Sequence, residues 1–244
     1  MPLPHTRIGF LVPPGNPTTE PEMFRLAPPG VGVHFTRMVA RGITGSHDGQ
    51  EERNLSQIAH LDENVEMLAL VQPAVIVLAH TATSYTLGRQ AEAELVERMH
   101  RSTGIPFITA FGSVLQALAE LGARRIALAT PYSEHWTERG RRHLQDHGVQ
   151  VVSSGRLENV RNIYLETPER AAELVRRVDS PQAQAVFISG VGMPTIDVLQ
   201  SLEDEIGKPV LSSASAMMWN ALRIAKVRNF VLGFGTLLSK ERKP

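Results

Sequence analysis

The chain contains no cysteine among its 244 residues. Disulfide bonds, thiolate metal sites and cysteine nucleophiles are therefore excluded. The chain also has no excess of one charge, because Lys and Arg together number 25 and Asp and Glu together number 25. A net charge of zero gives no electrostatic reason to expect binding to nucleic acid or to an anionic membrane surface.

Long apolar runs are missing as well. No run approaches the ~20 residues of a transmembrane helix, and the first residues lack the basic region and long apolar core of a signal peptide. We therefore expect a cytoplasmic protein without a membrane partner. Its 42% of hydrophobic residues is ordinary for a globular protein, and the chain is long enough to bury a proper core.

The most informative stretch is a continuous apolar run that ends at a histidine. Residues 74–79 read Ala-Val-Ile-Val-Leu-Ala, and His80 follows. Such a run is typical of a strand that is buried on both faces in a parallel sheet. In open α/β folds ligands bind at the carboxyl ends of the strands, so His80 is a candidate site residue. On this stretch alone, a histidine that merely packs at a strand end explains the pattern equally well.

Further strands and helices are predicted on both sides of this run. Apolar runs predict strands over residues 7–12, 31–38 and 104–109. Apolar residues at helical spacing predict one amphipathic helix over 51–70, with Leu55 on its apolar face. More helices are expected over 89–103 and 113–121. The loop at 13–20 has no glycine-rich nucleotide motif and no Walker lysine, so we reject a nucleotide site there.

The same design then starts again in the second part of the chain. Three segments resemble three earlier ones in the same order: residues 125–132 resemble 7–14, 186–190 resemble 76–80, and 207–212 resemble 104–109. The repetition implies two similar βα halves with parallel sheets and right-handed crossovers. We therefore predict an α/β fold of two Rossmann-like halves, related by a pseudo-twofold axis, with the ligand site between them.

The boundaries of the halves follow from the expected crossing points. The helix after Thr109 should lead into the second half, and the helix after Ser212 should lead back. The first half is then expected to comprise residues 1–110 and 215–244, with 230–234 on its side, and the second half residues 111–214.

Five segments carry a resemblance to a known family: residues 12–20 (Val-Pro-Pro-Gly-Asn-Pro-Thr-Thr-Glu), 80–85 (His-Thr-Ala-Thr-Ser-Tyr), 127–132 (Ala-Leu-Ala-Thr-Pro-Tyr), 188–192 (Ile-Ser-Gly-Val-Gly) and 207–213 (Gly-Lys-Pro-Val-Leu-Ser-Ser). Together they resemble the aspartate/glutamate racemase superfamily, and within it the maleate isomerase and arylmalonate decarboxylase branch. The resemblance covers nearly the whole chain, and it implies the fold predicted above.

The resemblance also shows where this chain departs from the family. In that superfamily the usual reactive pair is two cysteines, one from each half, on opposite faces of the substrate. The matching positions here are His80 and Gly190. Two-thiol racemisation, thiolate-dependent cis–trans isomerisation and protonation by a thiol are therefore not available in their family form.

The carboxylate-binding positions of the family are better preserved. Neutral hydrogen-bond donors suit this task, because hydrogen bonds to a charged acceptor are stronger than neutral ones. Ala82 stands where the decarboxylase has a hydroxyl residue, which weakens the match to its second carboxylate site. Ordinary loop packing is the alternative interpretation of the matching tyrosine and asparagines. The resemblance implies this substrate-binding set: Asn16, Thr81, Tyr132, Asn162, Gly190 and the backbone N–H of Val191.

His80 is the main candidate for proton transfer, Tyr132 is also a catalytic candidate, and His135, three residues past Tyr132, is an alternative. An ordinary imidazole has a pKa near ~6.5, so His80 is expected to titrate near neutrality. A single proton-transferring residue suggests decarboxylation, elimination or tautomerisation, not racemisation. No metal or other cofactor is expected, because the histidines show no metal-ligand spacing and there is no HExxH motif.

Two function classes follow from these residues. The first is a cysteine-independent enzyme acting on a small mono- or dicarboxylate by proton transfer at a carbon next to a carboxylate, as a decarboxylase, lyase or isomerase/tautomerase. The alternative is a catalytically retired carboxylate-binding protein of the same fold, which the loss of both thiols favours. Hydrolysis of a C–N bond has only Ser84 and Ser189 as candidate nucleophiles. Assembly into a homo-oligomer is left open.

Overall fold

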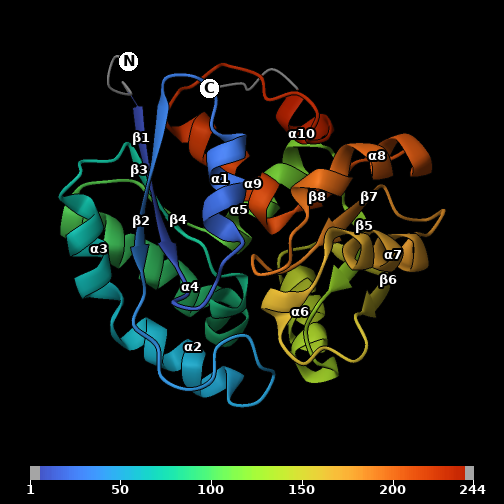
Figure 1. Cartoon of the computed structure of the whole chain (residues 1–244), viewed down its shortest axis with the longest axis horizontal. Helices are drawn as coiled ribbons and strands as arrows, with labels where there is room; N and C mark the ends of the chain where they lie inside the picture. The colour runs from blue at the N-terminus through green and yellow to red at the C-terminus, as the bar shows by residue number, and fades with distance from the viewer. Residues whose placement is uncertain (1–5, 240–244) are drawn as a thin grey trace.

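Two separate parallel sheets organise the chain. A computed structural model describes residues 6–239. Each sheet has four strands, in the order β2-β1-β3-β4 in the first and β6-β5-β7-β8 in the second. Figure 1 shows the first sheet on the left and the second on the right, each with its own helices. Because the strand order is the same in both, the predicted repeat and the two-half α/β fold are confirmed.

The equivalent strands of the two sheets end at equivalent places. The central pair of the first sheet aligns Leu11 with Leu78, and the central pair of the second aligns Ala129 with Ile188. His80 lies two residues after Leu78, and Gly190 lies two residues after Ile188. The strands are β1 (Thr6–Val12), β2 (Val31–Arg37), β3 (Val75–Leu78), β4 (Phe107–Thr109), β5 (Arg125–Thr130), β6 (Gln150–Arg156), β7 (Ala185–Ile188) and β8 (Val210–Ser212).

The helices connect these strands and cover the sheets. They are α1 (Thr19–Leu26), α2 (Gln50–Ala59), α3 (Leu61–Ala69), α4 (Thr81–Thr103), α5 (Ala110–Glu120), α6 (Glu134–Asp146), α7 (Pro168–Val178), α8 (Ile196–Ile206), α9 (Ser213–Ile224) and α10 (Thr236–Ser239), with a short 3₁₀ helix η1 (Ile163–Leu165). Helix α4 begins directly after His80 and bends at Gly88, whose φ is 74°. The expected helix over 89–103 is the later part of α4. No described helix is long and apolar enough to cross a membrane.

The single helix predicted over residues 51–70 is wrong, because the chain breaks at His60 into α2 and α3. The prediction also placed Leu55 on a buried face, whereas Leu55 is 52% exposed. Helix α3 does bury its apolar side, with Leu61, Val65 and Leu68 in the core. Helix α2 instead buries the polar side chains of Gln50, Arg53, Asn54 and Gln57.

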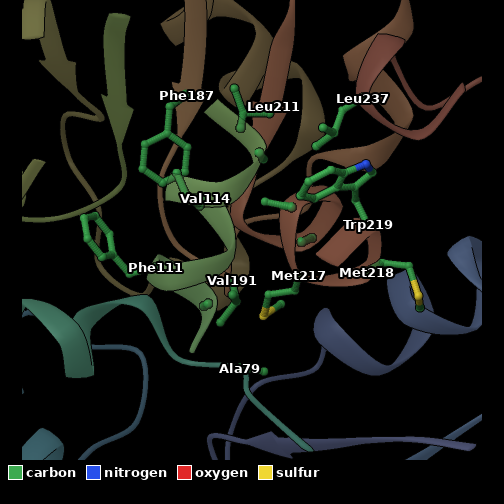
Figure 2. Close-up of a cluster of buried hydrophobic side chains, with 14 of the residues drawn as sticks. Ala79, Phe111, Val114, Phe187, Val191, Leu211, Met217, Met218, Trp219 and Leu237 are labelled. Carbon is green, nitrogen blue, oxygen red and sulfur yellow. The ribbon is translucent and has the colours of Figure 1, made fainter. Parts of the chain in front are cut away.

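One apolar core joins the two halves. Helices α5 and α9 pack against each other and lie near the middle of the molecule (Figure 1). Their buried side chains, which include Phe111 and Trp219, share a cluster with Phe10 of β1 and Phe187 of β7. Figure 2 shows part of this cluster, with α5 and α9 side chains beside those of the second sheet. The helices expected to cross between the halves therefore also tie them together.

The chain after α9 touches both halves. The guanidinium of Arg25 in α1 lies 5.7 Å from the ring centre of Phe234. The backbone N–H of Thr236 donates a 2.6 Å hydrogen bond to the carboxylate of Glu203 in α8. The division into residues 1–110 with 215–244 and residues 111–214 stays a prediction, and its two ends, 1–5 and 240–244, lie outside the described residues.

Candidate active site

A small cavity of about 30 Å³ lies where the strand ends of the two halves face each other. Asn16 and His80 line it from the first half, and Tyr132 and Val191 line it from the second. A water needs roughly 10–15 Å³ of such space, so the cavity has room for about two waters. A dicarboxylate is larger than this space, so its binding requires the cavity walls to move apart.

The loop at residues 42–49 reaches from the first half across to the second and forms one wall of the cavity. The ring nitrogen Nε2 of His47 lies 2.9 Å from the carbonyl oxygen of Pro131, and the carbonyl of Gly45 accepts a 2.9 Å hydrogen bond from the N–H of Ile163. These contacts hold the loop in place over the strand ends.

His80 occupies the step between β3 and α4. Its backbone is extended, at φ −151° and ψ 94°, so the helix starts with the next residue. The ring nitrogen Nδ1 lies 2.7 Å from the Thr83 hydroxyl oxygen. The other ring nitrogen, Nε2, has no hydrogen-bond partner among residues 6–239, and the ring lines the cavity. One nitrogen is thus fixed by the protein, and the other is available to a ligand.

The electrostatic surroundings of His80 differ from the sequence-based expectation. His80 keeps some accessible surface and lines the cavity, but it is surrounded by the protein on its other sides. Burial, followed by the positive charge of Arg53, lowers the pKa of His80 to about 4. The expected titration near neutrality is therefore corrected: at neutral pH the imidazole is uncharged, and it can accept a proton.

Tyr132 faces the same cavity from the second half. It is buried, and its hydroxyl lies near the hydroxyl of Ser189. The Ser189 hydroxyl oxygen in turn lies 2.9 Å from the hydroxyl oxygen of Tyr85. Burial, with smaller contributions from Tyr85 and Tyr164, raises the pKa of Tyr132 well above its usual range. Tyr132 therefore keeps its proton and can serve as a hydrogen-bond donor.

Gly190 has a left-handed backbone, with φ at 98°. A Cβ at this position would lie 3.1 Å from the Tyr132 hydroxyl oxygen and 3.1 Å from a ring carbon of Pro131. A side chain here would be strained by the backbone and would crowd Tyr132. The Gly190 N–H donates a 3.2 Å hydrogen bond to Ser213, so Gly190 shapes the wall behind Tyr132.

Asn16 lines the cavity, but its amide is fully engaged by the protein. The amide oxygen accepts hydrogen bonds from the N–H groups of Thr18 and Thr19, at 2.8 and 3.0 Å. The amide nitrogen donates to the Thr19 hydroxyl at 2.9 Å and to the carbonyl of Val191 at 3.2 Å. Asn16 thereby holds the backbone at the start of α1 and links the two halves, while its role in substrate binding stays a prediction.

Thr81, Asn162 and Gly190 do not line the cavity. The Thr81 hydroxyl donates a 2.9 Å hydrogen bond to Ser213. The Asn162 amide donates to the carbonyl of Thr44 at 3.2 Å and accepts from the N–H of Tyr164 at 2.9 Å. Asn162 thus holds the 42–49 loop onto the second half. The substrate-binding roles of these three residues also stay predictions.

Sequence reasoning missed the wall formed by α2. The side chains of Gln50, Arg53, Asn54 and Gln57 are buried and line the cavity. Their spacing places all four on one helical face, so the signal was present as a polar stripe. The search for apolar periodicity gave weight to Leu55 instead, which lies outside this stripe. The residues missed elsewhere are mainly His47 and Tyr164.

The cavity offers no evident metal-ligand set. Over the described part of the chain, no group of three or more His, Asp or Glu residues could hold a metal ion. The cavity walls instead carry amides, phenols, imidazoles and one guanidinium. These groups donate hydrogen bonds, and they suit an anionic oxygen ligand such as a carboxylate.

Relatives of known function share nearly the full length of the chain. A maleate isomerase of Geobacillus stearothermophilus is 28% identical over 96% of this chain and 98% of its own. A maleate isomerase of Nocardia farcinica is 30% identical, with 96% of each chain covered. An arylmalonate decarboxylase of Bordetella bronchiseptica is 29% identical over 89% of this chain and 90% of its own.

Solved structures agree with this relationship. The maleate isomerase Iso from Pseudomonas putida S16 superposes with a TM-score of 0.87 at 25% identity, covering 96% of this chain and 98% of its own. A crystal structure of arylmalonate decarboxylase gives a TM-score of 0.79 at 25% identity, covering 95% and 98%. The fold is that of the aspartate/glutamate racemase superfamily, as the resemblance implied. The family model described as arylmalonate decarboxylase matches residues 8–238, and the chain therefore belongs to that family.

Proposed function

We propose that the protein is a cysteine-independent enzyme that moves a proton at a carbon next to a carboxylate in a small mono- or dicarboxylate. The observation that carries this proposal is the setting of His80 in the cavity, with one ring nitrogen held by Thr83 and the other without a protein partner. The relatives named maleate isomerase and arylmalonate decarboxylase support a small carboxylate as the substrate.

The proposed step begins with proton abstraction. Nε2 of the neutral His80 takes the proton from the substrate carbon, and the electron pair of the broken C–H bond passes into the adjacent carboxylate to form an enediolate. The Tyr132 hydroxyl donates a hydrogen bond to an enediolate oxygen, with the hydrogen-bonded pair of Tyr85 and Ser189 beside it. His80 then returns the proton to the substrate at a different atom, or a leaving group departs with the electron pair.

The low pKa of His80 favours one part of the predicted range of reactions. A neutral imidazole is a proton acceptor, so it suits isomerisation, tautomerisation or elimination, each of which starts by breaking a C–H bond. Decarboxylation needs a proton donor after the carbon dioxide has left. We therefore place isomerase or lyase chemistry that begins with proton abstraction ahead of decarboxylation.

Exchange of carbon-bound hydrogen in deuterium oxide tests this proposal without knowledge of the product. A panel of small carboxylates, with maleate and phenylmalonate among them, is incubated with the protein and followed by proton NMR. At least one is expected to exchange or convert, and His80→Gln should slow this by about 10²–10⁴-fold. His100→Gln is the matched control, because His100 lies exposed in α4 outside the cavity.

The alternative hypothesis, a catalytically retired carboxylate-binding protein, predicts a different outcome of the same experiment. In that case a carboxylate binds in the cavity, but no exchange or conversion occurs with any member of the panel. The loss of both family thiols favours this alternative, and the setting of His80 favours the enzyme.

A further inference from the structure

Helix α2 is amphipathic in the reverse sense. A helix at the surface of a globular protein normally turns its apolar side chains inward and its polar side chains outward. In α2 the inward residues are polar, and they include Arg53 and Gln57, which are only 6% and 4% exposed. The apolar Leu55 points outward. Packing against an apolar core cannot explain this arrangement, whereas contact with a polar ligand in the cavity can.

Arg53 is a buried cation with the charge of Asp48 in its neighbourhood but no close ion pair among the described residues. Its guanidinium donates hydrogen bonds to the carbonyl oxygens of Ser46 and Asp48, and it forms no ion pair with any carboxylate of residues 6–239. Burying a charge is costly unless it is paired. The two carbonyls use two of the five N–H donors of the guanidinium, and the side chain lines the same cavity as His80.

Gln57 lies one turn further along the same face of α2. Its amide oxygen is buried and has no hydrogen-bond partner among the described residues. Leaving such a group unpaired is unfavourable, and a native structure that does so calls for an explanation. Gln57 also lines the cavity, and because its amide oxygen has almost no accessible surface, this oxygen meets a ligand only when the amide turns into the cavity.

We propose that Arg53 and Gln57 determine specificity, by binding an anionic oxygen group and an adjacent hydroxyl of the substrate. The substrate would carry two carboxylates, one next to the reacting carbon and a second one bound by Arg53. A guanidinium suits this task because it can donate two parallel hydrogen bonds to a carboxylate. Gln57 would accept a hydrogen bond from the hydroxyl. The substrate class is then a small hydroxylated dicarboxylate. The substrate class rests on the proposed function, and the binding subsite itself does not.

Binding measurements test the subsite independently of turnover. Dissociation constants are measured by calorimetry for butyrate, succinate and malate, which differ in turn by one carboxylate and by one hydroxyl. The wild type should prefer succinate to butyrate, and malate to succinate. Arg53→Gln should weaken the binding of succinate by about ten- to a hundredfold while changing butyrate little. Gln57→Leu should abolish the preference for malate over succinate.

The control separates the loss of the subsite from a general loss of charge. Arg142→Gln removes an exposed arginine of α6 outside the cavity, and it should leave all three affinities unchanged. If Arg53→Gln weakens butyrate and succinate equally, Arg53 merely holds the 42–49 loop and the proposal is wrong. If Arg53→Gln does not fold, Gln57→Leu decides alone, because a retained malate preference in that variant overturns the proposal. A failure of His80 chemistry would leave these binding results unchanged.

Discussion

The low pKa of His80 has two causes of different kinds. Burial disfavours the charged imidazolium, and the nearby guanidinium of Arg53 repels it. Burial and the charge of Arg53 together keep the His80 imidazole uncharged at neutral pH. A bound carboxylate would offset the charge of Arg53 and so raise the proton affinity of His80 at the moment when it must take up a proton.

The pH dependence of catalysis follows from this pair. Because the free protein must hold His80 uncharged, kcat/KM is expected to fall with acidity around pH 4. Arg53→Gln removes the repulsion, so the midpoint of this fall should move to higher pH. The measurement is kcat/KM against pH for both proteins, with a substrate that exchanges. Identical midpoints near ~6.5 in both would show that His80 behaves as an unperturbed imidazole.

Sequence patterns find residues at this scale only when the backbone determines where the side chain goes. His80 and Tyr132 follow buried strands directly, and both reach the cavity. Asn162 and Thr81 also follow from the family resemblance, but their side chains are turned toward loop and helix partners. The local backbone geometry determines where these two side chains point, and residue spacing in the sequence does not predict it.

The first N–H groups of helix α8 are hydrogen-bonded to a carboxyl group from the other half. Glu22 of α1 is buried, and its Oε1 accepts hydrogen bonds from the N–H groups of Thr195 and Ile196, at 2.7 and 3.1 Å. Its Oε2 is buried without a partner in the described chain. Burial, opposed by the two N–H groups, raises the pKa of Glu22 to about 7.

This raised pKa makes the stability of the protein depend on pH. The folded state holds a proton on Glu22 that the unfolded chain releases above pH 4.5, the ordinary pKa of a glutamate side chain. The stabilisation is therefore fully present below pH 4.5, and it is lost as the pH rises through about 7, with a total on the order of 3 kcal/mol. Urea unfolding of the wild type and of Glu22→Gln at about pH 5 and pH 8 isolates this contribution.

Glutamine keeps an acceptor for the start of α8 but cannot ionise. The difference in unfolding free energy between wild type and Glu22→Gln should therefore shift in favour of the variant at the higher pH. If that difference is the same at both pH values, Glu22 does not carry a raised pKa.

The elements themselves could largely be predicted from the sequence. Continuous apolar runs indicated the buried central strands, and the three matching segments indicated the repeat that the strand orders confirm. The break between α2 and α3 could not be predicted in this way, because Leu55 and Ile58 continue the apolar spacing into a helix whose inward face is polar. The buried side chains of α2 are those that line the cavity, so a hydrophobicity pattern does not identify them.

At the scale of the whole molecule, the shared core should make the halves unfold together. Phe111 of α5 is fully buried, and its ring centre lies 5.7 Å from that of Tyr85 in the first half and 4.3 Å from that of His143 in the second. Phe111→Ala should lower the free energy of unfolding by about 3–5 kcal/mol. Urea transitions followed by far-UV circular dichroism and by tryptophan fluorescence should still coincide. Two separate transitions in the wild type would contradict a shared core.

The two halves also explain why function is harder to infer than fold. The resemblance implies one reactive residue from each half, and the positions that match them here are His80 and Gly190. The family match establishes the arrangement of the halves. In this chain His80 lines the cavity and Gly190 does not, so the family match carries over the fold without the reactive pair.

The most direct test of His80 as the proton-transferring residue measures binding and turnover of the same carboxylate in His80→Gln and in the wild type. Calorimetry gives the dissociation constant, and proton NMR gives the rate of exchange or conversion. We predict that the variant binds within a few-fold of the wild type but turns over about two to four orders of magnitude more slowly. Full turnover in a folded His80→Gln protein would contradict the central claim.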